Sequence, residues 1–235
     1  MTQYREQMLS TAQKRERSIL KNVYLWMTAG LGLTGVVAYA VATNPAVMNI
    51  LLGSRFGFLL LVIVQLGLVV YLSARIEQMS STSAIIAFGS YAIVTGITFS
   101  TLFYVYSGLA ISRAFFTSAA LFGGMSLYGM TTKRDLHGIG HYLIMGLWGI
   151  IIASLINLLI GSEALYFGIS ILGVLLFLGL TAWDTQKIRA MNDAYGTDMD
   201  EESYIKLSII GALILYLDFI NIFLYLLRIF GRRER

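Results

Sequence analysis

The last apolar segment of the chain carries an aspartate near its middle. This segment runs from Lys206 to Arg228, and its apolar run of roughly 20 residues is long enough for a helix to cross the hydrocarbon core of a bilayer. An ionised Asp218 facing lipid would cost several kcal/mol. The segment therefore predicts a helix whose carboxylate faces the interior of a helix bundle, a water-filled cavity or a partner.

The composition of the chain is that of an integral membrane protein. Of its 235 residues, 57% are hydrophobic and 13% are charged, whereas about 25% of the residues of a soluble domain are charged. Cysteine is absent, which excludes disulfides, a thiolate nucleophile and a cysteine metal site. The net charge of +4 is not taken as a sign of nucleic-acid binding, because excess Lys and Arg in a membrane protein report which loops stay in the cytoplasm.

Seven apolar segments predict an all-α fold with seven transmembrane helices. These segments cover residues 23–42, 56–72, 84–106, 114–130, 142–160, 165–183 and 206–228. We expect a polar cytoplasmic tail at 1–22, a single transmembrane domain at 23–230 and a basic C-terminal tail at 231–235. Glycines recur inside the segments, where they allow helices to approach closely in lipid.

Three local features complete the predicted organisation. Thr43-Asn44-Pro45 marks a break after the first segment. The longest polar linker is expected over residues 184–202, directly after the sixth segment. Gly138 and Gly140 argue against a helix across His137 and His141, and without a further His or Cys these two residues do not predict a zinc site.

The distribution of Lys and Arg places the N-terminus in the cytoplasm. On that orientation the cytoplasmic tail and loops hold eleven basic residues, while the opposite loops hold only Arg55 and Arg113. The arginines from Arg228 to Arg235 disagree, since seven full spans put them on the outside. Either the early helices dictate the topology, or the last segment bends back at 218–221. We favour seven full spans.

Asp184 and Asp218 are the candidate functional carboxylates. Asp184 comes where the sixth segment ends, and consecutive antiparallel helices bring it toward Asp218 in the seventh. Two carboxylates close together in a low dielectric tend to share a proton, and the pair then senses pH. When ionised, the pair also offers transient oxygen ligands to Ca²⁺. The alternatives are that Asp184 is solvated or paired with Lys187, and that Asp218 makes only a structural hydrogen bond or ion pair.

Three further polar residues are candidates for supporting roles. Arg75, at the end of the second segment, is the candidate basic partner of the pair, the alternative being an ordinary anchor at the membrane surface. Gln65 lies inside the same segment as a polar pathway or packing residue, and Asn221 lies one turn after Asp218. No catalytic residue or cofactor is predicted, because none of the familiar hydrolase, metalloprotease or phosphate-binding motifs occurs.

Three motifs resemble signatures of one membrane-protein family. Residues 215–231, LYLDFINIFLYLLRIFG, closely resemble the C-terminal signature of the Bax-inhibitor (transmembrane Bax inhibitor motif) family. Residues 179–187, GLTAWDTQK, resemble its sixth-helix signature. Residues 126–136, SLYGMTTKRDL, resemble the loop after its fourth helix in a bacterial form. The likeness covers nearly the whole chain after the N-terminal tail.

The resemblance implies both an architecture and an activity. It implies six helices around a central C-terminal helix, and a pH-sensitive calcium leak whose sensor is an aspartate pair at the positions of Asp184 and Asp218. In that family a basic residue of the second helix locks the pair, and Arg75 aligns approximately with it. Bacterial relatives can also carry an acidic residue within the second helix, where this chain has Gln65.

The resulting hypothesis is a passive calcium leak of the bacterial inner membrane, with calcium as the permeant ion and the lipid bilayer as its surroundings. Two alternatives stay open. One is a proton-coupled secondary transporter that uses Asp218 as its proton carrier. The other is a non-transporting regulator that binds another membrane protein or a protease through glycine-rich helix faces.

Overall fold

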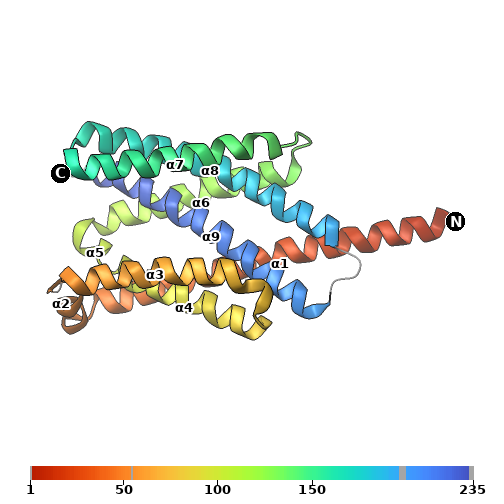
Figure 1. Cartoon of the computed structure of the whole chain (residues 1–235), viewed down its shortest axis with the longest axis horizontal. Helices are drawn as coiled ribbons and strands as arrows, with labels where there is room; N and C mark the ends of the chain where they lie inside the picture. The colour runs from red at the N-terminus through yellow and green to blue at the C-terminus, as the bar shows by residue number, and fades with distance from the viewer. Residues whose placement is uncertain (1, 54, 196–199, 233–235) are drawn as a thin grey trace. The chain divides into compact units, whose positions relative to one another are not determined.

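The computed structural model describes residues 2–53, 55–195 and 200–232, and all regular secondary structure in these ranges is helical (Figure 1). The predicted all-α class is therefore confirmed. The helices are α1 (Thr2–Ala42), α2 (Pro45–Gly53), α3 (Arg55–Arg75), α4 (Ser81–Phe99), α5 (Leu102–Val105), α6 (Gly108–Thr131), α7 (His137–Ile160), α8 (Glu163–Tyr195) and α9 (Glu201–Arg232), with the 3₁₀ turn η1 (Ile76–Gln78) after α3.

Six helical segments in the described part of the chain are long and apolar enough to cross a membrane. They are Ile19–Ala42, Ser81–Val105, Gly108–Thr131, His137–Ile160, Glu163–Met191 and Glu201–Gly231. The second predicted segment lies in α3, whose apolar stretch Leu59–Arg75 is shorter. The chain is thus a multi-span membrane protein, while the count of seven spans and the central position of the last helix stay predictions.

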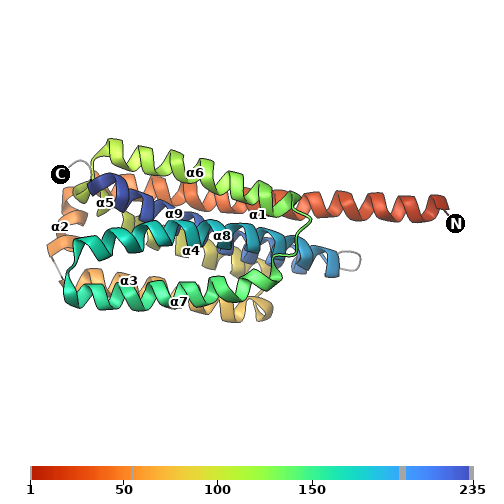
Figure 2. The ribbon, with the colours of Figure 1, turned by 90° about the horizontal axis from the view of Figure 1, so that it is seen from above.

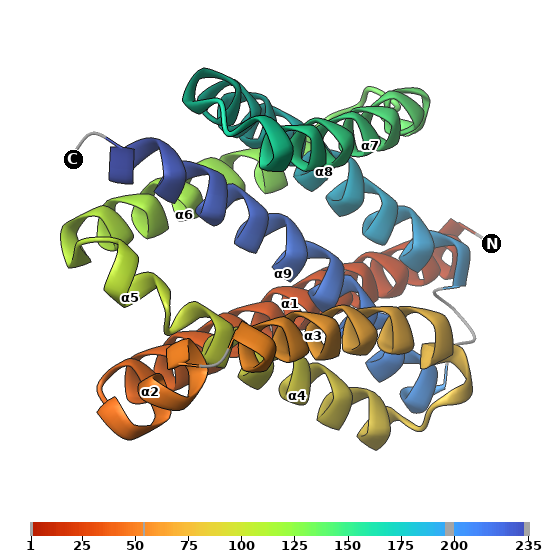
Figure 3. The same cartoon turned by 60° about the vertical axis from the view of Figure 1, so that its left-hand side comes forward.

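The chain divides into two compact units, and the first consists of Met1–Val105 and Met191–Tyr216. In this unit α4 packs against α1 and α3 (Figure 3). Gly96 permits the close contact of α4 with α1, because a Cβ atom there would lie 2.7 Å from the carbonyl oxygen of Thr34. The Thr34 hydroxyl in turn donates a hydrogen bond of 3.0 Å to the carbonyl oxygen of Ala92.

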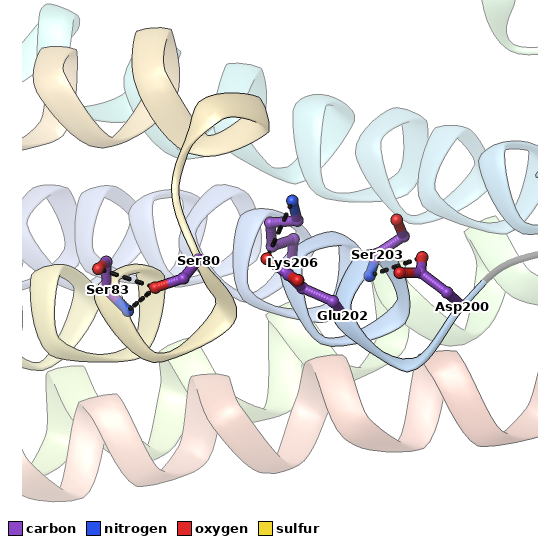
Figure 4. A network of polar contacts seen from close by, with 6 residues as sticks. All are labelled: Ser80, Ser83, Asp200, Glu202, Ser203 and Lys206. Atoms are coloured by element: carbon purple, nitrogen blue, oxygen red, sulfur yellow. Dashed lines mark hydrogen bonds and ion pairs between the residues drawn. The ribbon is translucent and has the colours of Figure 1, made fainter.

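Polar side chains cap the starts of α2, α4 and α9 in the first unit. The chain breaks between α1 and α2, where the Asn44 Oδ1 atom accepts hydrogen bonds from the backbone N–H groups of Ala46 and Val47. Pro45 is the first residue of α2, a position where its missing N–H costs nothing. Ser80 caps α4 and Asp200 caps α9 in the same way (Figure 4).

The second unit consists of Tyr106–Ala190 and Leu217–Arg235. In it α7 and α8 run antiparallel (Figure 2) and are joined by a short turn, in which Gly161 has a φ of +69° and the Asn157 Oδ1 atom accepts the Ser162 N–H. Gly140 of α7 faces the indole ring of Trp183, and Gly179 of α8 faces Leu143. These glycines let the two helices approach closely, as the sequence predicted for the spans in general.

Two expectations about helix boundaries are wrong. The polar linker expected over 184–202 is helical up to Tyr195, since α8 continues with buried Thr185 and Ile188 on one face and without a Gly or Pro to end it. The region of Gly138 and Gly140 is also helical, since α7 begins at His137. The glycine at position 140 serves the contact with Trp183, because a side chain there would collide with the indole ring.

Two other segments differ from the simplest sequence interpretation. The third predicted segment is interrupted, because α4 ends at Phe99 and a separate short helix, α5, begins at Leu102. The predicted polar tail is helical from Thr2 and continuous with the first span. The last segment, in contrast, is a single helix through 218–221, so the chain does not bend back there.

Candidate functional site

Asp184 and Asp218 both belong to the second unit, on α8 and α9 respectively. Both side chains are buried, with exposed fractions of 8% for Asp184 and 4% for Asp218. They are close enough to interact through their charges. The structure therefore brings together the two carboxylates that the sequence singled out, although Asp184 lies well inside α8 rather than at its end.

Aromatic contacts set the register of α8 against the second half of α9. The rings of Phe177 and Tyr225 lie 5.9 Å apart, and a Cβ atom at Gly173 would lie 2.6 Å from the Tyr225 ring. One turn after Phe177, the Thr181 side chain is a polar neighbour of Asp218. The Thr181 hydroxyl donates to the carbonyl oxygen of Phe177 at 2.7 Å, which anchors the side chain on its own helix.

Helix α6 forms a third wall of the site. The Phe219 ring, next to Asp218 along α9, lies 5.7 Å from the rings of both Phe115 and Phe122 of α6. Further along α6, Gly129 lies against α8, where a Cβ atom would collide with the carbonyl oxygen of Ala182 and lie 3.0 Å from the Thr185 Cβ. The three helices α6, α8 and α9 therefore contact one another around the two aspartates.

Several buried polar atoms of this unit have no hydrogen-bond partner among the described residues. They are the Asp218 Oδ2, Ser126 Oγ, Thr185 Oγ1 and Trp183 Nε1 atoms. Most buried polar side-chain atoms in proteins are paired, so each exception calls for a physical explanation. Their concentration on α6, α8 and α9 marks this region as the candidate site.

Lys187 is the cationic group that acts on Asp184. Pairing with Lys187 was the alternative role that the sequence offered for this aspartate. Lys187 attracts the Asp184 carboxylate electrostatically, but its Nζ atom lies over the Trp183 ring, 5.2 Å from the centroid. Lys187 thus offsets part of the negative charge of Asp184, while its ammonium group also contacts the indole ring. It lies toward the end of α8 that is predicted to be cytoplasmic.

Two residues near the end of α8 hold the loop between α6 and α7, and the sequence did not single them out. The Gln186 side chain accepts the Leu136 N–H at 2.8 Å and donates to the Arg134 carbonyl oxygen at 2.9 Å. Arg189 donates to the Met130 carbonyl oxygen at 2.6 Å, near the C-terminal end of α6. In the sequence, these two residues could have been found only by recognising that the sixth span continues as an amphipathic helix beyond residue 183.

The remaining predicted site residues make local contacts. Arg75 and Gln65 belong to the first unit. Arg75 is exposed and its Nη1 atom donates to Gln78 at 2.8 Å, and Gln65 hydrogen-bonds to Thr95 and Thr98 of α4. Asn221 donates to the Leu217 carbonyl oxygen of its own helix at 2.8 Å. The contacts of Gln65 and Asn221 are those of packing residues, and the partnership of Arg75 with the aspartates stays a prediction.

The carboxylate pair supplies only part of a calcium coordination shell. Ca²⁺ takes six to eight oxygen ligands, and two carboxylates offer at most four oxygens. Within the described ranges, no cluster of three or more His, Cys, Asp or Glu side chains occurs. A calcium ion at the pair would therefore need further oxygen ligands from water, hydroxyl groups or the backbone.

The sequence is similar to bacterial membrane proteins over nearly its full length. It is 48% identical to the inner membrane protein YbhL of Escherichia coli, over 93% of each chain. It is also 42% identical to an uncharacterized protein of Deinococcus radiodurans over the whole of both chains, and 41% identical to one of Borreliella burgdorferi over 97% of this chain and 99% of the relative. Residues 16–235 match the family described as "Inhibitor of apoptosis-promoting Bax1". The chain therefore belongs to the Bax inhibitor family.

Proposed function

We propose that this protein is a pH-sensitive passive calcium leak of the bacterial inner membrane, gated by a proton that Asp184 and Asp218 share. Its six candidate spans and its similarity to an inner membrane protein support that location. Membership of the Bax inhibitor family and the matching signatures around both aspartates support the activity.

The observation that carries the proposal is the burial of two interacting carboxylates between α8 and α9. Two negative charges at this depth repel each other and lose the hydration they would have in water, so the pair holds a proton more readily than an exposed aspartate does. Loss of that proton leaves a doubly ionised pair, which pushes α8 and α9 apart and offers additional oxygen ligands to a divalent cation. A proton thus couples pH to the contact between these two helices.

Arg75 is proposed as the basic partner of the ionised pair, as the family resemblance implies. The Asp184 and Asp218 carboxylates would then exchange a shared proton for an ion pair with the guanidinium group. Because burying an ionised carboxylate without a partner is costly, such a partner would decide how stable the deprotonated arrangement is.

The test is calcium entry into dye-loaded proteoliposomes across a pH series. We expect the wild-type protein to conduct calcium with a pH-dependent rate, and both Asp184→Asn and Asp218→Asn to flatten that dependence, because an amide cannot titrate. Asp135→Asn is the matched control, since Asp135 is an exposed aspartate of the same unit that accepts the His137 N–H just before α7. An unchanged pH profile in Asp218→Asn contradicts the assignment of the pair as the sensor.

The same experiment separates the two other functions. Well-folded protein that shows no calcium flux at any pH would favour a regulator that binds another membrane protein. Uptake that requires an imposed pH gradient would favour a proton-coupled transporter with Asp218 as the carrier.

A further inference from the structure

Two buried hydroxyl groups of the second unit lack the hydrogen bond that such groups usually make. A Ser or Thr in a helix can donate to the carbonyl oxygen four residues earlier. Ser118, Ser170 and Thr181 of the same unit all do so, at 2.6, 2.8 and 2.7 Å respectively. Ser126 and Thr185 do not, although their exposed fractions are only 3% and 0%.

These two hydroxyl-bearing residues share faces with residues already placed at the site. Ser126 lies one turn after Phe122, which contacts Phe219, and one turn before Gly129, which contacts Thr185. Thr185 lies one turn after Thr181, the neighbour of Asp218. The helical register therefore brings Ser126 of α6 and Thr185 of α8 to the same side of the bundle as Asp218.

The third unpaired atom of this group is the Oδ2 atom of Asp218, whose side chain is 4% exposed. No two of these three oxygens bond to each other. Leaving all three without any partner would forfeit about 1–3 kcal/mol for each group. These three buried oxygens come from three helices, and one ligand that both donates and accepts hydrogen bonds would satisfy them together.

We propose that Ser126, Thr185 and Asp218 line a binding site for ordered water between α6, α8 and α9. Water fits because it both donates and accepts, and a buried water typically makes two to four hydrogen bonds. The hydroxyls can donate to the water oxygen, and the water can donate to the carboxylate. Its role rests on the proposed function: the water gives the Asp218 carboxyl a hydrogen-bonded neighbour with which to exchange its proton inside an apolar core. Among the charged side chains, Asp184 acts electrostatically on Asp218, and Lys187 acts on Asp184.

A crystal structure of the full chain in lipid, at a resolution that shows ordered water, tests the site directly. We expect density within hydrogen-bonding distance of at least two of the three oxygens. Absence of density, with Ser126 rotated to bond the Phe122 carbonyl oxygen and Thr185 rotated to bond that of Thr181, overturns the proposal. An anomalous peak at this position after soaking with Mn²⁺ also overturns it, since the ligand would then be a cation.

Variants provide a second test, which asks whether the same density depends on the two hydroxyls. The density should be lost in the double variant Ser126→Ala/Thr185→Val and kept in the control Ser118→Ala, which removes an equally buried hydroxyl of α6 that is already paired within its helix. Should the double variant fail to fold, Thr185→Ser retains the hydroxyl and is expected to retain the density. The outcome does not depend on calcium flux, so the water site and the leak can fail separately.

Discussion

In the first unit the polar groups around Tyr216 form a closed network, whereas in the second unit the polar groups around Asp218 leave oxygens unpaired. The Tyr216 hydroxyl and the Thr34 hydroxyl lie 2.7 Å apart, and Thr34 donates onward to the Ala92 carbonyl oxygen. Gln65 bridges Thr95 and Thr98 with both ends of its amide. In the second unit, in contrast, the hydroxyls of Ser126 and Thr185 and one oxygen of Asp218 have no partner.

This difference separates a structural polar interior from a functional one. A fully paired network fixes the packing of its helices, and any rearrangement must break several hydrogen bonds at once. Buried oxygens without protein partners keep their capacity for water, a proton or a passing cation. Tyr216 and Asp218 are only two residues apart on α9, yet the Tyr216 hydroxyl is paired within its network, whereas one oxygen of Asp218 is unpaired.

The largest expected effect comes from adding a methyl group where α6 and α8 are in tight contact. Gly129→Ala would place a Cβ atom against the carbonyl oxygen of Ala182, and a backbone atom cannot move aside as a flexible side chain can. We expect the free energy of unfolding to fall by about 3 kcal/mol, measured by denaturation in mixed detergent micelles.

Gly124→Ala is the matched control on the same helix, because no atom lies within 4 Å of a Cβ built there. It should leave stability unchanged or raise it by up to about 1 kcal/mol, the difference in helix propensity between Ala and Gly. Equal losses in both variants would show that α6 and α8 are not in close contact at Gly129.

A smaller effect is expected from opening the closed network of the first unit. Gln65→Leu removes the amide that joins Thr95 and Thr98, but both hydroxyls can still donate to carbonyl oxygens of their own helix. The free energy of unfolding should therefore fall by about 1 kcal/mol, while the pH profile of calcium flux in proteoliposomes stays that of the wild type. A profile flattened as in the aspartate variants would instead place Gln65 in the ion pathway.

Most of the fold could be predicted because the length and spacing of apolar segments are visible in one dimension. The errors concern places where a contact between helices decides the local structure. Gln186 and Arg189 bind backbone oxygens in the loop after α6 and near the end of α6. These contacts belong to the part of α8 beyond Asp184, which the sequence had predicted to be a linker. Gly140 lies within α7 and contacts Trp183, and neither residue reveals this contact in the sequence alone.

The candidate site could be predicted only in its charged part. Asp218 is conspicuous because a carboxylate in an apolar span is costly wherever it lies. Ser126 and Thr185 are not, since hydroxyl residues are common in transmembrane helices and usually bond to their own backbone. Their distinguishing feature is a hydrogen bond that they do not make, and this can be recognised only once α6, α8 and α9 are placed in three dimensions.

The smallest expected effect concerns Asp200, an exposed carboxylate whose environment is the opposite of that of Asp218. The Ser203 hydroxyl and the Ser203 backbone N–H lower the pKa of Asp200, and the bond from the N–H is drawn in Figure 4. A carboxylate with a lowered pKa in the folded state stabilises that state at pH values above its ordinary pKa, and this contribution is lost as the pH falls through the lowered value.

The Ser203 amide should therefore lose protection against hydrogen exchange as the pH falls through the pKa of folded Asp200, with the change confined to the first turn of α9. Asp200→Asn still caps the helix but cannot titrate, so its protection, corrected for the intrinsic exchange rate, should not vary with pH. If the Asn variant loses protection in the same way, the pH dependence does not come from Asp200. In that case the capping hydrogen bonds would not be what keeps Asp200 ionised. Asp200 and Asp218 would then differ only in that the first is exposed and the second is buried.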